Sequence, residues 1–383
     1  RDRERVIYNL QEGYYMINEK RLLDTFLEYV QIDSETKNEK AMGERLVQDL
    51  KALGFEVQTD RAGEAFGSNG FNVHAFLEGT IPGDPTIFCA HMDTVAPGNG
   101  IRPVIKDGII GTDGSTILAG DDKSGIAAIM EALTVIKEKD LPHRSADILF
   151  TIGEEGGMNG AKNMDYSMLK GKEAMVFDAG GDTGKVLTCG PGQIKINATI
   201  TGRSSHAGLA PEAGISAIQA AAKGIAKMNL LRIDEETTCN IGTLRSEYAT
   251  NIVPEKAVLV AEVRSRDLDK LNAQAAHMKQ CLEEACQELG ASLDIDLSTN
   301  YVSFRVDNDD ELVKRVFAAC GRLGIPASTE KGGGGSDANV MALHGIKPVV
   351  LSTGMTKVHT TEETLKVEEL NKCAALVLDL LTN

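Results

Sequence analysis

Two adjacent aspartates in an apolar setting are the first residues of this sequence that could carry chemistry. Asp121 and Asp122 stand in the stretch LAGDDKSG, among leucine, alanine and glycine. One interpretation is a helix cap, because an aspartate oxygen accepts an otherwise unpaired N–H at the start of the helix that KSGIAAIMEALTVIKEKD suggests. The other is a metal-binding or catalytic role, which depends on what the rest of the chain places beside them.

Two further stretches place pairs of ionisable residues directly after β-rich runs. AHMDTV follows TIFC and carries His91 and Asp93, which share one face because residues i and i+2 of an extended chain point to the same side. An imidazole binds zinc well, and a neighbouring carboxylate fixes its tautomer and orientation. GEEGGMNG places Glu154 and Glu155 after ADILFTI. One carboxylate of such a pair can bind metal while the other takes a proton from metal-bound water. The plain alternatives are polar loop residues for His91 and Asp93, and a solvated helix N-terminus for Glu154 and Glu155.

Asp178 in VFDAGG and His359 in LSTGMTKVHTTEE complete the set. Five strand-to-loop junctions then carry His, Asp or Glu, in a chain with seven histidines. Two histidines and three or four carboxylates are ligands suited to two Zn²⁺ ions, or to cobalt or manganese. A dinuclear site also needs a bridging carboxylate, and two ions about 3.5–4 Å apart can share one water as nucleophile.

The elements that must position these residues alternate between helix and strand. RLLDTFLEYV and AMGERLVQDLKAL place apolar residues at i, i+3, i+4 and i+7, which predicts amphipathic helices. FNVHAFLEG, TIFCAHMD, ADILFTIGEE and AMVFDAGG predict short strands that end in acidic, His or Gly residues. The alternation predicts an α/β domain with a mostly parallel sheet, in which ligands bind outside the carboxyl ends of the strands.

The middle of the chain follows a different order: strand, helix, two strands, helix, strand. This β-α-β-β-α-β order is the ferredoxin-like arrangement, which forms a small α+β domain by itself. We therefore predict a catalytic domain formed by 16–191 plus 300–383, interrupted by an inserted domain at 192–299. Residues 1–15 are expected to be an extension, because the first convincing helix begins after them.

Composition limits the class of protein. A chain of 383 residues exceeds one simple core, and 42% hydrophobic with 25% charged residues is typical of a soluble globular protein. A net charge of −16 argues against binding the phosphate backbone of nucleic acid. No apolar run approaches the roughly 18 residues that a membrane helix needs. The seven cysteines show no CxxC spacing, and their odd number fits a reducing cytoplasm.

The motifs His-Met-Asp, Gly-Asp-Asp-Lys, Gly-Glu-Glu-Gly and Phe-Asp-Ala, with a late His after Ser-Thr-Gly, occur in this order along the chain. Together they resemble the co-catalytic dizinc peptidases and deacylases, a superfamily that includes peptidase T, glutamate carboxypeptidases, aminoacylases and acetylornithine deacetylase. Within it the chain is most similar to the peptidase T family of tripeptide aminopeptidases. The resemblance implies hydrolysis of the N-terminal peptide bond of short peptides by metal-bridged water, with a glutamate as general base.

The resemblance also assigns the metal ligands for two Zn²⁺ ions per chain. Asp121 bridges the two ions, and family members hold the Asp–Asp bond that follows it in a cis conformation. The remaining ligands fall into two pairs, His91 with Asp178 and Glu155 with His359.

The other functional residues follow from the same resemblance. Asp93 is expected to orient His91, and Glu154 is expected to be the general base that later protonates the leaving amine. In relatives the inserted domain is a lid that forms a dimer, and its histidine reaches a substrate carbonyl, often in the partner's active site. The residues expected to bind substrate are His206 in GRSSHAG, Asn251, Arg264, Gly335 and Gly354.

Three alternatives stay open at this point. An N-acyl-amino-acid deacylase or a metallocarboxypeptidase would share every metal ligand. A non-catalytic binding module on the same fold would show a lost ligand or base, and none is lost. KGGGGSDANV lacks the Gly-Lys-Ser/Thr ending of a P-loop and the Gly-x-Gly-x-x-Gly spacing, which argues against a nucleotide. The expected partners are a short peptide and a second copy of the chain, with no nucleic acid and no membrane.

Overall fold

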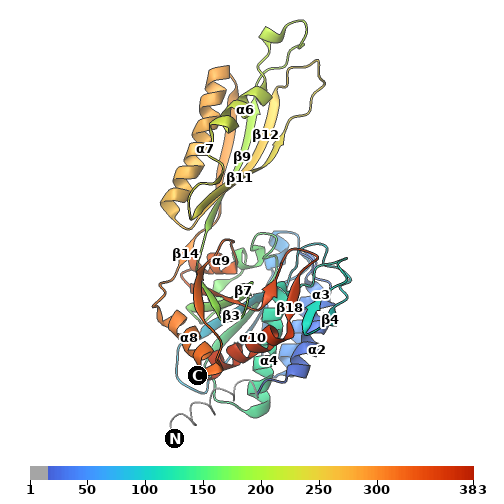
Figure 1. Cartoon of the computed structure of the whole chain (residues 1–383), viewed down its shortest axis with the longest axis vertical. Coiled ribbons are helices and arrows are strands. Elements are labelled where there is room, and N and C mark those ends of the chain that lie inside the picture. The colour runs from blue at the N-terminus through green and yellow to red at the C-terminus, as the bar shows by residue number, and fades with distance from the viewer. Residues whose placement is uncertain (1–15) are drawn as a thin grey trace. The chain divides into compact units, whose positions relative to one another are not determined.

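The computed structural model describes residues 16–383, which divide into two compact units (Figure 1). The first unit comprises the chain up to Cys189 together with Val306–Gly332 and Ser336–Asn383. The second comprises Gly190–Arg305 and Gly333–Gly335. Each unit has its own hydrophobic core. The extension predicted at the N-terminus lies outside the described residues.

The first unit is built on a mixed sheet with the strand order β1-β2-β6-β3-β7-β16-β8, in which β15 also pairs with β8. Neighbouring strands β6, β3, β7 and β16 run parallel, so their carboxyl ends lie at one edge of the sheet. This confirms the α/β fold with a mostly parallel sheet. The strands are β1 (Val57–Thr59), β2 (Val73–Leu77), β3 (Thr86–His91), β6 (Ala146–Thr151), β7 (Glu173–Ala179), β8 (Lys185–Gly190), β15 (Ser328–Lys331) and β16 (Lys347–Ser352).

The helix α4 (Gly120–Lys139) is central to this unit. It packs on β3 and β7, and α2 and α10 pack on it (Figure 1). Its residues from Gly120 to Ile136 are nearly all buried, as expected of a helix that is apolar on most sides. The other helices are α2 (Glu19–Val30), α3 (Lys40–Ala52), α5 (Asn159–Lys162), α8 (Glu311–Leu323), α9 (Asp337–Leu343) and α10 (Val367–Thr382), with short 3-10 turns η1 (Ala62–Ala65) and η2 (Tyr166–Met168).

A second, small sheet in this unit has the antiparallel order β17-β18-β5-β4. The connection between β17 and β18 is important for the site because it carries His359 and Glu363. The strands are β4 (Val104–Lys106), β5 (Ile109–Gly111), β17 (Met355–Thr356) and β18 (Thr364–Lys366).

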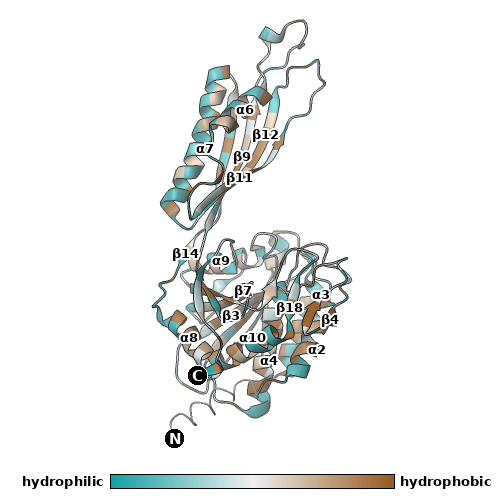
Figure 2. Cartoon of the chain, in the orientation of Figure 1, coloured by the Kyte–Doolittle hydropathy of each residue, from teal (hydrophilic) through white to brown (hydrophobic). Residues whose placement is uncertain are grey.

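The second unit is an antiparallel sheet with the order β10-β11-β12-β9-β13, on which α6 and α7 pack. α7 is hydrophilic along much of its length (Figure 2), whereas Leu271, Met278 and Leu282 are buried in the core of the unit. No helix among residues 16–383 is both long enough and apolar enough to span a membrane. The elements are β9 (Gly192–Thr201), η3 (Pro211–Ala213), α6 (Ala217–Lys227), β10 (Leu231–Arg232), β11 (Thr237–Arg245), β12 (Lys256–Ser265), α7 (Leu268–Leu289), β13 (Ser292–Tyr301) and β14 (Phe304–Arg305).

Candidate metal centre and active site

Four of the predicted site residues lie at the carboxyl edge of the parallel strands. His91 is the last residue of β3, and Asp178 lies one residue before the end of β7. Glu154 and Glu155 follow β6, after Gly153, whose positive φ of 62° turns the chain. Because these strands are parallel neighbours, their ends bring together side chains that are far apart in the sequence.

Asp121 lies between the two predicted histidine ligands. Its Oδ1 is 3.0 Å from His91 Nε2, and its Oδ2 is 3.2 Å from His359 Nε2. His91 Nε2 is also 3.5 Å from Asp178 Oδ1, and His359 Nε2 is 2.8 Å from Glu155 Oε1. Each oxygen of Asp121 therefore faces one histidine, and each histidine has one further carboxylate beside it.

Within the described residues, three overlapping groups of three side chains could each hold a metal ion. The ligand atoms of each group lie within 4.8 Å of one another. Imidazole nitrogens and carboxylate oxygens in this number fit divalent ions of the zinc, cobalt or manganese type. We call these residues the acidic cluster: His91, Asp121, Glu154, Glu155, Asp178 and His359.

The tautomer of His91 favours binding of a cation at Nε2. Nδ1 lies 2.9 Å from the backbone carbonyl oxygen of Asp93, and a carbonyl only accepts hydrogen bonds, so Nδ1 carries the proton. Nε2 then turns a lone pair toward Asp121 and Asp178 unless a proton or a metal ion lies between them. This is the usual arrangement of a metal-binding histidine whose second nitrogen is held by the protein.

The pKa values of both histidines reflect the negative charge around them. Burial alone would lower the pKa of His91, but the hydrogen bonds that its protonated ring donates to Asp121 and Asp178 outweigh burial and hold the pKa well above its usual value. The half-exposed His359 has its pKa raised to about 10 by Asp121 and then by Glu155. A divalent cation would take the place of these protons, because histidine binds metal in its neutral form.

The carboxylates of the acidic cluster are buried or partly buried, and their pKa values differ. Burial raises the pKa of Asp178 to about 7 and raises the pKa of Glu154 well above its usual value, with Asp178 adding to the effect on Glu154. For Asp121, burial also acts to raise the pKa, but hydrogen bonds to His359 and His91 hold it below the usual range. The cluster thus has more carboxylates than protein cations to balance them, which favours binding of external cations.

Asp93 contacts both His91 and the turn that carries the two glutamates of the acidic cluster. Its carboxylate accepts the backbone N–H groups of Glu154 and Glu155 at 2.9 and 3.2 Å and the hydroxyl of Thr36 at 2.7 Å. The same carboxylate is 3.6 Å from His91 Nδ1, farther than the Asp93 carbonyl oxygen that this nitrogen contacts. Asp93 therefore holds the turn that carries the two glutamates as well as the His91 ring.

The helix-cap interpretation of the two aspartates is wrong. Asp122 Oδ2 accepts the backbone N–H of His91 at 3.2 Å, and its Oδ1 has no hydrogen-bond partner in the described part of the chain. Asp121 faces the two histidines. The residue at the cap position is Ala119, with a left-handed φ of 62°. The Asp121–Asp122 peptide bond is cis, as the family resemblance predicted.

The sequence reasoning missed two buried charged residues beside the cluster. Glu363 is 1% exposed and accepts three backbone N–H groups from the segment that precedes Asp122. Lys123 is fully buried and donates its Nζ to the carbonyl of Ile32 at 2.7 Å. Glu363 stands in the polar stretch HTTEE, where no local signal marks it as buried. Lys123 stands in LAGDDKSG, whose apolar neighbours were a signal that the sequence reasoning did not use for this residue.

Four of the predicted substrate-binding residues belong to the second unit: His206, Asn251, Arg264 and Gly335. His206 and Asn251 are exposed, and their segments lie together: His206 is paired with Ile252, and the Ala207 N–H donates to the Asn251 carbonyl at 2.9 Å. Arg264 on β12 is already paired, because its Nε donates to a Glu262 carboxylate oxygen at 2.8 Å.

The two predicted glycines are both required by close packing. A Cβ at Gly335 would lie 2.5 Å from the ring of Tyr301, and a Cβ at Gly354 would lie 2.2 Å from Glu369 Cβ. Gly354 also has a positive φ of 95°, and its N–H donates to the Gly181 carbonyl. Their role in this structure is thus backbone packing; a contact with substrate stays a prediction.

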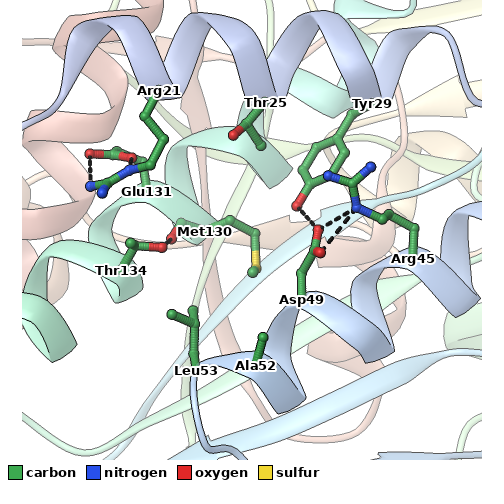
Figure 3. A pocket seen from close by; sticks show the side chains of 10 residues that line it. All are labelled: Arg21, Thr25, Tyr29, Arg45, Asp49, Ala52, Leu53, Met130, Glu131 and Thr134. Carbon is green, nitrogen blue, oxygen red and sulfur yellow. Dashed lines mark hydrogen bonds and ion pairs between the residues drawn. The ribbon is translucent and has the colours of Figure 1, made fainter.

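A pocket of about 210 Å³ lies elsewhere in the first unit, between α2, α3 and α4 (Figure 3). Arg21 pairs with Glu131, and Arg45 pairs with Asp49, which also accepts the hydroxyl of Tyr29. No residue of the acidic cluster lines this pocket. Its lining residues are Arg21, Thr25, Tyr29, Arg45, Asp49, Ala52, Leu53, Met130, Glu131 and Thr134.

Comparison with known families identifies the class of protein. The model of peptidase family M20/M25/M40 matches residues 87–383, which include the whole acidic cluster. The chain belongs to peptidase family M20/M25/M40. As a member of this family it is a metal-dependent hydrolase, which confirms the predicted enzyme class.

Relatives of this M20/M25/M40 peptidase resemble it over almost the whole chain. Aminopeptidase PepT from Bacillus cereus ATCC 10987 is 44% identical, with a TM-score of 0.90 and coverage of 96% of this chain and 99% of that one. A tripeptidase (SAV1512) from Staphylococcus aureus subsp. aureus mu50 is 39% identical, with a TM-score of 0.92 and coverage of 96% and 98%. The "Uncharacterized protein YqjE" of Bacillus subtilis (strain 168) is 42% identical over 96% of this chain and 99% of that protein. The predicted resemblance to peptidase T-like enzymes is confirmed.

Proposed function

We propose that this enzyme is a dizinc aminopeptidase that cleaves the first residue from short unblocked peptides, tripeptides foremost. The observation that carries the proposal is the position of Asp121, whose two oxygens face His91 and His359 at 3.0 and 3.2 Å. A carboxylate that faces two histidines from its two oxygens is suited to bridge two metal ions.

The contacts of the acidic cluster support the proposed ligand assignment. His91 and Asp178 would hold one ion, Glu155 and His359 the other, and Asp121 both. The donors suit Zn²⁺, with Co²⁺ and Mn²⁺ as alternatives. When bound, such a pair of ions lowers the pKa of a water molecule and polarises the scissile carbonyl.

Glu154 is the residue best placed to move the proton. Its carboxylate is buried beside Asp178, and its pKa is raised well above the usual value by burial. In our proposal it takes a proton from the attacking water and gives it to the amine of the departing product, while the carbonyl carbon exchanges its C–N bond for a C–O bond. The hydrogen bond from the Glu154 N–H to Asp93 keeps this side chain at the cluster.

The preference for short unblocked peptides rests on the relatives, which are described as an aminopeptidase and a tripeptidase. Arg264 is our candidate for the carboxylate end of the peptide, and it would have to exchange its contact with Glu262 for the substrate. We further propose that the second unit is a ferredoxin-like lid, supplies His206 and Asn251 to the substrate, and forms a homodimer. A cytoplasmic location stays a prediction from the cysteine content.

A substrate panel tests the proposal. Metal-loaded enzyme is incubated with free tripeptides, N-acetylated tripeptides, dipeptides and N-acyl amino acids, and products are identified by mass spectrometry. We expect release of the first residue from free tripeptides, well ahead of the other compounds. Glu154→Gln protein serves as the control for contaminating peptidases. Preference for blocked compounds would instead assign the enzyme to the deacylases or carboxypeptidases and leave the metal centre in place.

A further inference from the structure

We infer that Glu363 is a positioning residue that holds Asp121 at the right place between the two proposed metal ions. Its Oε2 accepts the backbone N–H groups of Leu118 and Ala119, both at 2.9 Å. Its Oε1 accepts the N–H of Asp121 at 2.9 Å. One side chain thus fixes the backbone on both sides of Gly120, up to the residue proposed to bridge the ions.

These three hydrogen bonds satisfy buried backbone donors in the segment that leads into α4, where Leu118 and Ala119 precede the helix and Asp121 has non-helical φ and ψ. A buried backbone N–H group outside a regular helix needs another acceptor, because leaving it unpaired costs free energy. A carboxylate is a strong acceptor for such groups. Ala119 also holds a left-handed φ of 62°, a conformation that a residue with a Cβ rarely adopts without support from its surroundings.

The contact joins two parts of the metal centre that are distant in sequence. Glu363 lies four residues after His359, in the connection between β17 and β18, and its partners lie 242 to 245 residues earlier in the chain. His359 Nε2 and Asp121 Oδ2 are 3.2 Å apart, so both ends of this contact carry a proposed ligand. A shift of Glu363 would change the distance between these two ligands.

The chemistry requires a carboxylate of this length. Both oxygens act as acceptors, so a glutamine would turn an NH₂ donor toward a backbone N–H donor on one side. Aspartate keeps both acceptors but is one methylene shorter. Glu363 is not among the ligand groups of the described cluster, which indicates that it acts through Asp121 and not by binding an ion.

Two control variants separate positioning from general stability. Glu131 is a second buried carboxylate that faces α2 from the middle of α4, where it accepts the Asn18 N–H at 2.9 Å and pairs with Arg21. Glu131→Gln therefore disturbs a buried carboxylate of the same helix away from the cluster. Glu362 is the exposed neighbour of Glu363 and pairs with Lys357, so Glu362→Gln removes one charge from the same loop.

The test is a Co²⁺ titration of full-length protein, followed by calorimetry and by the visible absorption of the bound ion. Loss of a residue that orients a ligand typically weakens metal binding by about 10–100-fold. We expect Glu363→Gln to weaken one of two Co²⁺ sites by this factor, to change the cobalt spectrum, and to lower kcat more than it raises KM. Glu363→Asp should lie between this variant and the parent. Glu131→Gln should lose stability but bind two ions with the parental spectrum, and Glu362→Gln should match the parent.

The inference rests on the proposed metal centre, and the two can fail separately. A parent protein that binds fewer than two ions contradicts the proposed centre itself. Two parental sites that persist unchanged in Glu363→Gln, with a lower unfolding temperature only, would show a merely structural role for Glu363. Should the variants not fold, hydrogen exchange of the metal-free parent decides. Slow exchange of the Leu118, Ala119 and Asp121 amides supports a preformed contact, and rapid exchange overturns it.

Discussion

Two groups of buried and partly buried charges in the first unit include residues of the same helix, and they differ in how the charge is balanced. At the pocket between α2, α3 and α4, Glu131 is paired with Arg21, and Asp49 is paired with Arg45 (Figure 3). Glu131 stabilises the charged form of Arg21, because the hydrogen bond between them raises the pKa of Arg21 above its ordinary value. In this pocket each of the two carboxylates has its own arginine.

In the acidic cluster at the start of α4, by contrast, the carboxylates outnumber the cationic side chains. Four carboxylates face two histidines, and the pKa values of both histidines are raised because they lie beside carboxylates. A buried excess of negative charge is costly unless cations balance it. The comparison indicates that charge balance distinguishes a site prepared for metal ions from a structural ion-pair cluster.

The largest effect that the comparison predicts is on turnover. Glu154→Gln keeps the shape of the side chain but removes the proposed base, and general-base contributions are typically about 10²–10⁴-fold. We expect kcat for a free tripeptide to fall by at least this factor while metal content, measured by elemental analysis, is unchanged. Glu131→Gln, at the balanced group, should keep parental kcat. Near-parental turnover in Glu154→Gln would remove Glu154 from the mechanism.

The second prediction concerns stabilisation by metal. A ligand that binds the folded chain alone at about 1,000 times its Kd stabilises it by about 4 kcal/mol. The parent should therefore gain several degrees in unfolding temperature when Zn²⁺ or Co²⁺ is added to chelator-treated protein, and Asp121→Asn should lose most of that gain.

Glu131→Gln provides the contrast in the same experiment. Removing a buried hydrogen-bonded charge should lower stability by about 1–3 kcal/mol with or without metal, so the gain on adding metal should equal that of the parent. A metal-dependent effect of Glu131→Gln would mean that the two groups of charges are coupled through α4, contrary to the comparison.

The positions of the predicted ligands were accessible from the sequence for a simple reason. His91, Glu154 and Asp178 each stand at or after a short buried strand, and parallel neighbouring strands end at one edge. The pairing of Arg264 with Glu262 was also accessible, because residues i and i+2 of a strand share a face. The sequence reasoning did not use it, and it treated Arg264 as free to bind substrate.

Glu363 illustrates what the sequence could not provide. It stands in the polar stretch HTTEE beside the exposed Glu362, and nothing in that stretch indicates which of the two is buried. Its burial results from contacts with a segment more than 240 residues earlier, which only the folded chain brings near. The αL conformation of Ala119 was hidden for the same reason, since alanine carries no sequence signal for a positive φ.

The smallest predicted effect concerns how the stability of the folded chain depends on pH, a dependence whose sign should change when metal binds. In the metal-free chain the pKa of His359 is raised from 6.5 to about 10 by Asp121 and then by Glu155. A group whose pKa is higher in the folded state adds stability below its unfolded pKa and loses that contribution as pH rises through the folded pKa. Stability of the metal-free parent should therefore decline between pH 6.5 and about 10. Because His359 is half exposed, solvent screening should limit its share to about 1 kcal/mol or less.

With metal bound, stability should instead increase as pH rises. The ions bind neutral histidine and compete with protons, and protons become scarcer at higher pH. Unfolding temperatures at pH 6.5 and pH 9, with chelator or with Co²⁺, measure both slopes. His359→Gln should flatten the metal-free slope and reduce the metal-bound one. Glu131→Gln should shift both curves by a constant amount, since Arg21, whose pKa is raised by its hydrogen bond to Glu131, stays charged throughout this range. Identical metal-free slopes in the parent and His359→Gln would show that protons do not balance the acidic cluster through His359, and the balancing role would then fall to His91.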